Sequence, residues 1–136
     1  MQKKQPATIF HHFRRPPQGV RAVLAVMLSI AMGSAGLQAQ GPIGGTVRAG
    51  DAQITGEGTA STQIRQFTDR AVIDWRQFGI GADGQVVFSQ PSSQSATLNR
   101  VTGAQVSVIL GKLDANGQVL LINPNGIVFG GGAQVN

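Results

Sequence analysis

Short stretches in which apolar side chains cluster or alternate with polar ones recur along the chain from residue 40 onward. Each stretch is bounded by Gly, Asn, Asp or Pro, the residues typical of turns, and none keeps the spacing of an amphipathic helix. The pattern predicts strands over residues 62–67, 71–75, 85–89, 97–101, 105–110, 118–122 and 127–129. Such a succession of short strands indicates an all-β fold, either a sandwich, a barrel or a solenoid.

One segment of the chain is repeated. Residues 82–91 align with residues 115–124 without a gap, at an offset of 33. Each copy contains a turn, a strand and a second turn that includes Pro91 or Pro124. Repetition at a fixed period is typical of stacked coils, since one coil cannot bury its apolar face alone. A sandwich of two hairpins would give the same repeat, so the repeat leaves both folds open.

The second copy ends in the sequence Asn123-Pro124-Asn125-Gly126, which predicts a β-turn. Pro124 fixes φ near about −65° for the first central position, Asn125 suits the second, and Gly126 ends the turn without steric cost. The side chain of Asn123 is expected to accept a backbone N–H and close the turn. A strand then resumes at residue 127.

Two further turns are predicted at Asn116-Gly117 and Asp83-Gly84. These residue pairs tolerate a positive φ, which is the conformation that tight hairpin turns require. Each pair comes directly before one of the repeated strands.

The larger apolar residues of the strand runs are expected to supply much of the packing between coils. A solenoid buries one continuous core between neighbouring coils. These residues are Trp75, Phe78, Phe88, Ile109, Leu121 and Phe129.

The formal net charge of +5 arises in the first 21 residues. That segment holds Lys3, Lys4, Arg14, Arg15 and Arg21 and no acid. From residue 40 onward there are six basic and six acidic residues, so this part is formally neutral. Nucleic-acid binding needs a surplus of basic residues on the folded part, and the sequence therefore argues against it.

The amino-terminal segment has the three parts of a secretory signal. Its basic stretch ends at Arg21, an uncharged apolar run covers residues 22–32, and small residues follow. The run is shorter than the roughly 20 apolar residues of a membrane span. We expect a helical or unstructured signal peptide with an extended basic region over residues 1–39, cut after Ala39.

Alternatives for this segment are a cut after Ala35 or Gly36, and an uncleaved membrane anchor. The general secretion route is favoured over the twin-arginine route, because two prolines follow Arg14 and Arg15. The absence of Cys is compatible with an oxidising destination.

The part from residue 40 onward offers little reactive chemistry. Both histidines lie before it, and it has no Cys or Tyr, which excludes Ser–His–Asp and Cys–His catalytic units and soft-metal ligand sets. Asp69 and Asp74 are expected to be solvated surface acids on opposite sides of the strands. Residues 79–84 match G-x-G-x-x-G, but a strand-like run follows instead of a helix, so we interpret these glycines as turns. The sequence predicts no enzyme, cofactor, metal site or small-molecule substrate.

From Trp75 onward, several motifs follow one another in a fixed order. They occupy residues 75–81, 87–93, 98–103 and 116–130, and their most distinctive members are Trp75, Gln90, Pro91, Leu98, Asn99, Arg100, Val101, Asn116, Gly117, Asn123, Pro124, Asn125 and Gly126. This order resembles the amino-terminal secretion domain of two-partner secretion exoproteins, the filamentous-haemagglutinin family. The resemblance covers residues 41–136 and is weaker before residue 74.

The resemblance implies a right-handed parallel β-helix with a role in secretion. It implies export by the general secretion machinery, with signal peptidase, through the periplasm to the cell surface or medium. The partner would be an outer-membrane transporter whose POTRA modules recognise the domain. The passenger would be a large exoprotein of the adhesin, haemolysin or contact-dependent toxin type.

Domains of that family continue beyond the Asn-Pro-Asn-Gly motif. Residues 40–136 are therefore expected to be the first part of a truncated haemagglutinin-activity domain, with an incomplete β-helix. The alternatives are a fragment of a carbohydrate-active β-helix enzyme of the pectate-lyase kind, and a segment of a surface adhesin.

Overall fold

A computed structural model describes residues 40–136, and the predicted signal peptide with its cut after Ala39 lies outside the described residues. The described part is all-β and contains no helix, as predicted. No helix in this part could therefore span a membrane. Its strands are β1 (Thr46–Ala49), β2 (Ala52–Thr55), β3 (Ser61–Gln66), β4 (Arg70–Trp75), β5 (Gln85–Ser89), β6 (Ala96–Val101), β7 (Ser107–Ile109), β8 (Lys112–Ala115), β9 (Gln118–Ile122), β10 (Ile127–Phe129) and β11 (Gln134–Val135).

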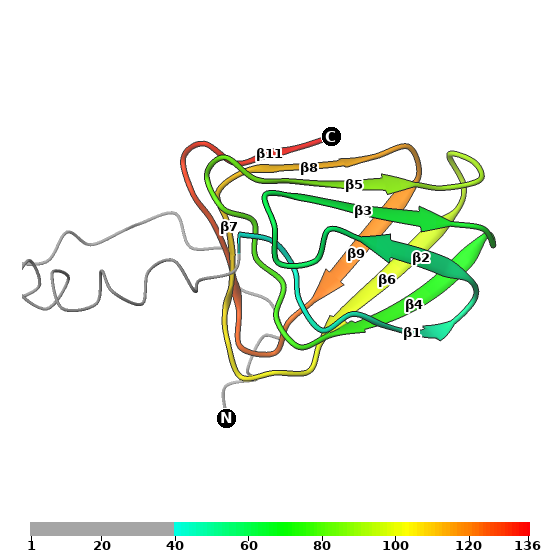
Figure 1. The fold of residues 1–136 in the computed structure, drawn as a ribbon, viewed down its shortest axis with the longest axis horizontal. Coiled ribbons are helices and arrows are strands. Elements are labelled where there is room, and N and C mark those ends of the chain that lie inside the picture. The colour runs from blue at the N-terminus through cyan, green and yellow to red at the C-terminus, as the bar shows by residue number, and fades with distance from the viewer. Residues whose placement is uncertain (1–39) are drawn as a thin grey trace, which may run out of the picture.

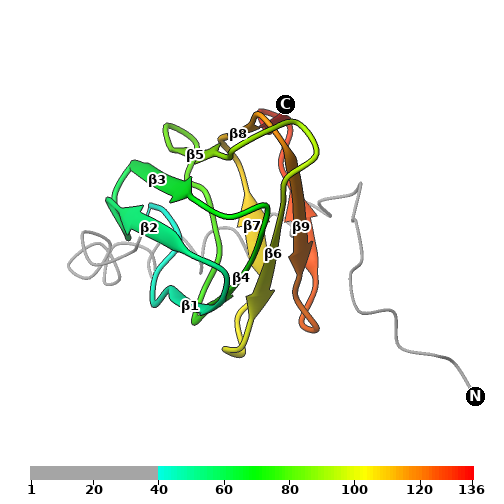
Figure 2. The ribbon, with the colours of Figure 1, turned by 90° about the vertical axis from the view of Figure 1, so that its right-hand side faces the viewer.

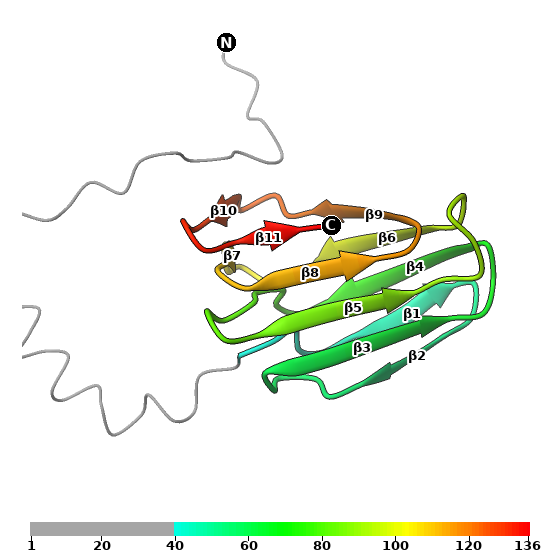
Figure 3. The ribbon, with the colours of Figure 1, turned by 90° about the horizontal axis from the view of Figure 1, so that it is seen from above.

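The strands form three sheets that the chain visits in turn. The sheet orders are β11-β8-β5-β3-β2, β1-β4-β6-β9 and β10-β7. Figures 1 and 2 show the two larger sheets as opposite walls of one stack, and Figure 3 shows the stacking order of the strands from above. One coil consists of β5, β6 and β7, and the next of β8, β9 and β10, with parallel pairing between coils. The fold is therefore the right-handed parallel β-helix that the sequence resemblance implies.

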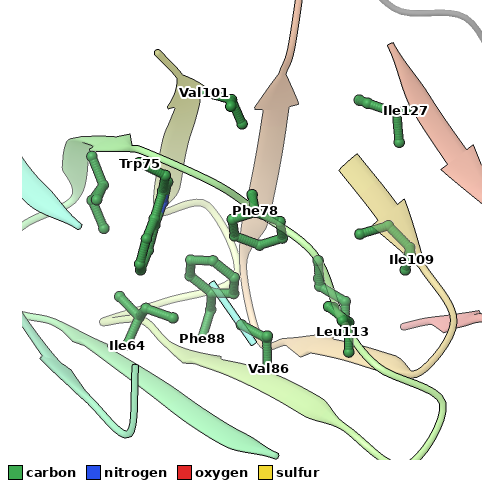
Figure 4. Close-up of a cluster of buried hydrophobic side chains, with 11 residues drawn as sticks. Ile64, Trp75, Phe78, Val86, Phe88, Val101, Ile109, Leu113 and Ile127 are labelled. Carbon is green, nitrogen blue, oxygen red and sulfur yellow. The ribbon is translucent and has the colours of Figure 1, made fainter. Parts of the chain in front are cut away.

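Alternation along each strand sends one side chain inward and the next outward. In β3 and β5 the parallel register places Ile64 opposite Phe88, and both are buried. Figure 4 shows these two side chains in the apolar cluster between the walls, beside Trp75 and Phe78. The rings of Trp75 and Phe78 meet edge to face, with centroids 5.6 Å apart.

The predicted packing residues are mostly in this core. Trp75, Phe78, Phe88 and Ile109 are buried, which confirms the prediction for them. Leu121 and Phe129 are only partly buried and pack against the edge of the cluster. They belong to the last described coil, over which no further coil is described.

The first coil is covered by two antiparallel strands that the sequence pattern did not reveal. β1 pairs with β4 and β2 pairs with β3, and Ile54 of β2 packs against the core. The covering chain lies very close to Trp75. A Cβ at Gly45 would lie 2.7 Å from the indole ring and 2.8 Å from Ile54, so a residue without a side chain is needed there.

The repeat at an offset of 33 is not the period of the coils. Residue 85 pairs with residue 112, 27 positions later, and residue 96 pairs with residue 118, 22 positions later. The two repeated strands, β5 and β9, lie in different sheets. The solenoid is confirmed, but the interpretation of the repeat as successive coils is wrong, because its two copies lie on different walls and 33 is not the length of a coil.

The candidate recognition turn and its buried amides

The Asn-Pro-Asn-Gly turn connects β9 to β10 and has the predicted form. The backbone N–H of Gly126 donates to the carbonyl of Asn123 over 3.1 Å, which closes the β-turn. The backbone N–H of Asn125 donates to Oδ1 of Asn123 over 2.9 Å, which confirms the predicted side-chain closure. Gly126 has a φ of 114°. Among the described residues, only glycines have a positive φ.

The base of this turn is fixed to the preceding coil. Nδ2 of the fully buried Asn123 donates to the carbonyl of Gln105 and to Oγ of Ser107, each over 2.9 Å. Nδ2 of Asn125 donates to the carbonyl of Gly103 over 2.8 Å. Pro124 and Asn125 are nevertheless exposed. The turn therefore combines a buried amide base with an exposed tip that is hydrogen-bonded to the rest of the domain.

A second buried amide, Asn99, lies beneath Trp75. The indole N–H of Trp75 donates to Oδ1 of Asn99 over 2.9 Å, and Nδ2 of Asn99 donates to the carbonyl of Leu120 over 3.2 Å. Asn99 is fully buried. Its side chain thus connects β4, β6 and β9, one strand from each of three successive coils.

A third amide network closes the corner between β5 and β6. The backbone N–H and carbonyl of Gln90 bond to the side-chain amide of Asn116, both over 2.7 Å. The Gln90 side chain donates to the carbonyl of Gln118 over 2.9 Å and to Oγ1 of Thr97 over 3.0 Å. Its Oε1 accepts the backbone N–H of Gly117 over 2.9 Å. This network joins two consecutive coils at the same corner.

Neither Gly117 nor Gly84 has the positive φ that their residue pairs predicted. Gly117 is required for another reason. A Cβ at this position would lie 2.7 Å from Oε1 of Gln90 and 2.7 Å from the carbonyl oxygen of Ser95. The glycine allows the corner of one coil to approach the corner of the coil before it.

Some of the remaining motif residues point into the core and others point outward. Val101 is buried in the core, Leu98 is partly buried on the outer side of β6, and Pro91 and Arg100 are exposed. Arg100 forms an ion pair with Asp74.

Asp74 lies on the outer side of β4, as expected of a surface acid, but it is ion-paired with two arginines and its side chain is only 14% exposed. Nε of Arg100 lies 2.7 Å from one carboxylate oxygen of Asp74, and Nε of Arg48 lies 3.1 Å from the other. The hydrogen bond from Arg100 is the main cause of a lowered pKa for Asp74. Asp69 lies in a bend before β4 and accepts a hydrogen bond from Ser95 over 3.2 Å.

The described residues offer little for catalysis. Within residues 40–136, no three side chains of His, Cys, Asp or Glu gather as a metal site would require. Gly81 and Gly84 flank a turn at residues 82–83, closed by the N–H of Gly84 donating to the carbonyl of Gly81, which confirms the prediction for these two. Gly79 lies outside that turn, next to the bridge residue Ile80, and a strand, not a helix, follows.

Two hollows are lined without titratable side chains. One, of about 590 Å³, lies along residues 77–81 and 105–110, with walls that include Val106, Val108 and Leu110. The other, of about 400 Å³, lies at the carboxy-terminal end of the stack beside Leu121 and Phe129.

A β-solenoid whose corners are closed by buried amides is the structural class that these features define. A family model described as "TPS secretion domain" matches residues 39–136. The chain belongs to this family, the secretion domains of two-partner secretion exoproteins.

Relatives in Haemophilus influenzae support the assignment. A heme/hemopexin-binding protein of strain Rd is 45% identical over 95 residues, which is 70% of this chain and 10% of that protein. A second protein of the same description is 48% identical over 73 residues, which is 54% of this chain and 8% of that protein. The crystal structure of the HMW1 secretion domain is 46% identical, with a TM-score of 0.65, over 71% of this chain and 25% of that one. The chain thus spans about a tenth of the matched curated relatives.

Proposed function

We propose that residues 40–136 form the part of an exoprotein that its cognate outer-membrane transporter recognises through periplasmic POTRA modules. Membership of the TPS secretion domain family is the observation that carries this proposal. In this role the domain directs the polypeptide that contains it out of the cell. The proposed role is recognition and needs no catalysed reaction.

The proposal includes an export step before recognition. The basic and apolar pattern of residues 1–39 supports delivery to the periplasm by the general secretion machinery, followed by cleavage after Ala39. From the periplasm the transporter would carry the protein to the cell surface or the medium. The haem and hemopexin binding in the names of the relatives is not included, because the chain matches only about a tenth of those proteins.

Within this domain, the Asn-Pro-Asn-Gly turn is a candidate contact for the transporter. Its buried base supports a structural role, and its exposed Pro124 and Asn125 support an additional role in recognition. The two roles differ in what a mutation should change. Loss of a structural contact lowers stability and binding together, whereas loss of a recognition contact lowers binding alone.

The experiment compares Asn125→Ala with Gln63→Ala, an exposed amide on β3, in the exported chain. Circular dichroism melting measures folding, and capture by the immobilised periplasmic part of the cognate transporter measures binding. Recognition by the turn predicts a folded Asn125→Ala variant with weaker capture and an unchanged Gln63→Ala variant. Unchanged folding and capture in both variants would remove the turn from the proposal. Absence of capture with the unaltered chain would refute the function itself.

A further inference from the structure

The charges of the described residues are separated between two sides of the solenoid. Arg48, Arg70 and Arg100 lie on the outer side of the sheet β1-β4-β6-β9, and Arg76 follows β4 directly. Asp74 is the acid on this side. Four arginines and one aspartate give a formal charge of +3. We call this surface the arginine face, and it also includes the outward side chains Val72, Leu98, Leu120 and Ile122.

The rest of the described part carries the opposite charge. Its two basic residues are Arg65 and Lys112, and its five acids are Asp51, Glu57, Asp69, Asp83 and Asp114. Asp51 and Asp69 lie at corners where the chain enters or leaves the arginine face, and the others lie beyond it. The arginine face as defined carries a formal charge of +3. When the corner acids Asp51 and Asp69 are counted with it, as Arg76 is, the face carries +1 and the remainder of residues 40–136 carries −1.

An apolar row crosses the middle of the arginine face. The parallel register places Val72, Leu98 and Leu120 side by side on three successive strands. Leu120 is 49% exposed and Ile122 is 40% exposed, although both belong to a regular strand. Single exposed apolar side chains are common on protein surfaces, whereas a contiguous apolar row of this kind is typical of an interaction site.

The arginines on either side of this row are held in place to different degrees. Asp74 fixes Arg48 and Arg100 in a row across β1, β4 and β6, yet their side chains remain 59% and 47% exposed. Arg70 and Arg76 are exposed and have no ion pair among residues 40–136. Both kinds of arginine therefore still have donors available to an incoming carboxylate.

We propose that the arginine face docks a carboxylate-rich surface of the cognate transporter that also carries apolar side chains. This inference rests on the proposed function and names the surface and the chemistry of the partner. Arginine and exposed aliphatic groups together are typical of protein interfaces, where opposite charges steer the approach and apolar contacts form the centre. Single-stranded nucleic acid is disfavoured, because the face has no aromatic side chain on which bases stack.

The test reverses charge on each face by the same amount. Arg70→Glu with Arg76→Glu changes the arginine face, and Arg65→Glu with Lys112→Glu is the matched control on the opposite sheet. Leu120→Ser probes the apolar row, and Val108→Ser, at an exposed position outside the face, is its control. Each exported chain is titrated against the periplasmic part of the cognate transporter at low and at physiological salt, with circular dichroism as a check on folding.

The expected result is a dissociation constant about tenfold higher for the arginine-face double variant, with a weaker dependence on salt. Leu120→Ser is expected to weaken binding several-fold, and both controls are expected to stay within about twofold of the unaltered chain. Equal weakening by the two charge reversals would overturn the inference while leaving the proposed function intact. Failure of the unaltered chain to bind would instead refute the proposed function.

Two parallel titrations separate this partner from other anions. Vesicles of phosphatidylglycerol and phosphatidylethanolamine represent a lipid surface, and a 20-nucleotide single strand represents nucleic acid. If the Arg70→Glu, Arg76→Glu variant loses more affinity for vesicles or for the oligonucleotide than for the transporter, the assignment to a protein partner is overturned. Binding of the transporter alone through these residues supports it.

Discussion

The indole N–H of Trp75 donates to Oδ1 of Asn99 over 2.9 Å, across 24 residues of sequence and from one coil to the next. Both side chains are fully buried, and Nδ2 of Asn99 donates a hydrogen bond to the backbone carbonyl of Leu120 in β9. A polar group buried in this way must find a partner, because its desolvation is otherwise uncompensated. The pair thus fixes the register of three coils inside an otherwise apolar wall.

Replacement of Asn99 should therefore destabilise the domain more than replacement of an exposed polar residue does. Asn99→Ala leaves the indole N–H without an acceptor, at an expected cost of about 1–3 kcal/mol for the unpaired donor. Urea unfolding monitored by tryptophan fluorescence measures this cost. Gln118→Ala, at an exposed position of β9, is the control and should change the unfolding free energy by less than about 0.5 kcal/mol. Equal effects of the two substitutions would contradict the role of Asn99.

The apolar core depends strongly on Phe88. This side chain is 1% exposed and lies between the two walls of the solenoid, so Phe88→Ala should cost about 3–5 kcal/mol. Phe67→Ala is the matched control, since Phe67 is 49% exposed and the guanidinium of Arg65 lies over its ring, with Cζ 5.3 Å from the ring centre. Its loss should cost less than about 1 kcal/mol. Denaturant unfolding of the two variants measures the difference, and similar costs would refute the described packing.

Close packing at the β8–β9 corner predicts an unusual sensitivity to one methyl group. Gly117→Ala must displace the Gln90 side chain or the backbone near Ser95, with a cost of about 1–3 kcal/mol. Gly131→Ala is the control, because nothing lies within 4 Å of a Cβ at that position and its φ is not positive. Thermal melts of both variants provide the test. A Gly117→Ala variant as stable as Gly131→Ala would show that the corner is looser than described.

The Asp74 ion pairs predict a contribution to stability that depends on pH. The pKa of Asp74 is lowered from its ordinary value of 3.8, mainly by the hydrogen bond from Arg100. The folded state therefore favours the carboxylate, and this stabilisation is fully present above the unfolded pKa. It is lost as the pH falls through the lowered folded pKa.

Asp74→Asn should remove this part of the acid sensitivity, so that the free energy of unfolding falls less between neutral pH and about pH 3 than in the unaltered chain. Asp83→Asn, at an exposed acid with no ion pair among the described residues, should keep the original pH profile. Urea unfolding at a series of pH values gives the comparison. Parallel profiles for the Asp74→Asn variant and the unaltered chain would contradict the prediction.

Strand positions could be predicted from sequence where inward apolar residues alternate with polar ones. The predicted and observed bounds agree for β5, β9 and β10, whereas the strand predicted at 105–110 is shorter, at Ser107–Ile109. β1, β2, β8 and the two-residue β11 were missed because each has few inward apolar residues. In β8, for example, Leu113 is the one buried residue. A single inward apolar residue in a short segment does not distinguish a strand from a loop in the sequence.

The partners of the buried amides could not be predicted from sequence. Gln90, Asn99 and Asn123 interrupt the apolar pattern as surface residues would, and their partners in neighbouring coils lie 16 to 28 residues away. Those distances vary because the coils differ in length, so no fixed spacing connects the residues. The family motifs marked these positions as distinctive, but only the register between coils explains why amides occupy them.

The central claim is that the cognate transporter recognises this domain. The most direct test is the affinity of the exported chain for the periplasmic part of that transporter, measured by isothermal titration. The same part of an unrelated two-partner transporter is the control. The account predicts saturable binding to the cognate partner, and clearly weaker binding to the unrelated one. The account would be contradicted if a chain shown by circular dichroism to be folded gave no heat above the heat of dilution when titrated with the cognate partner.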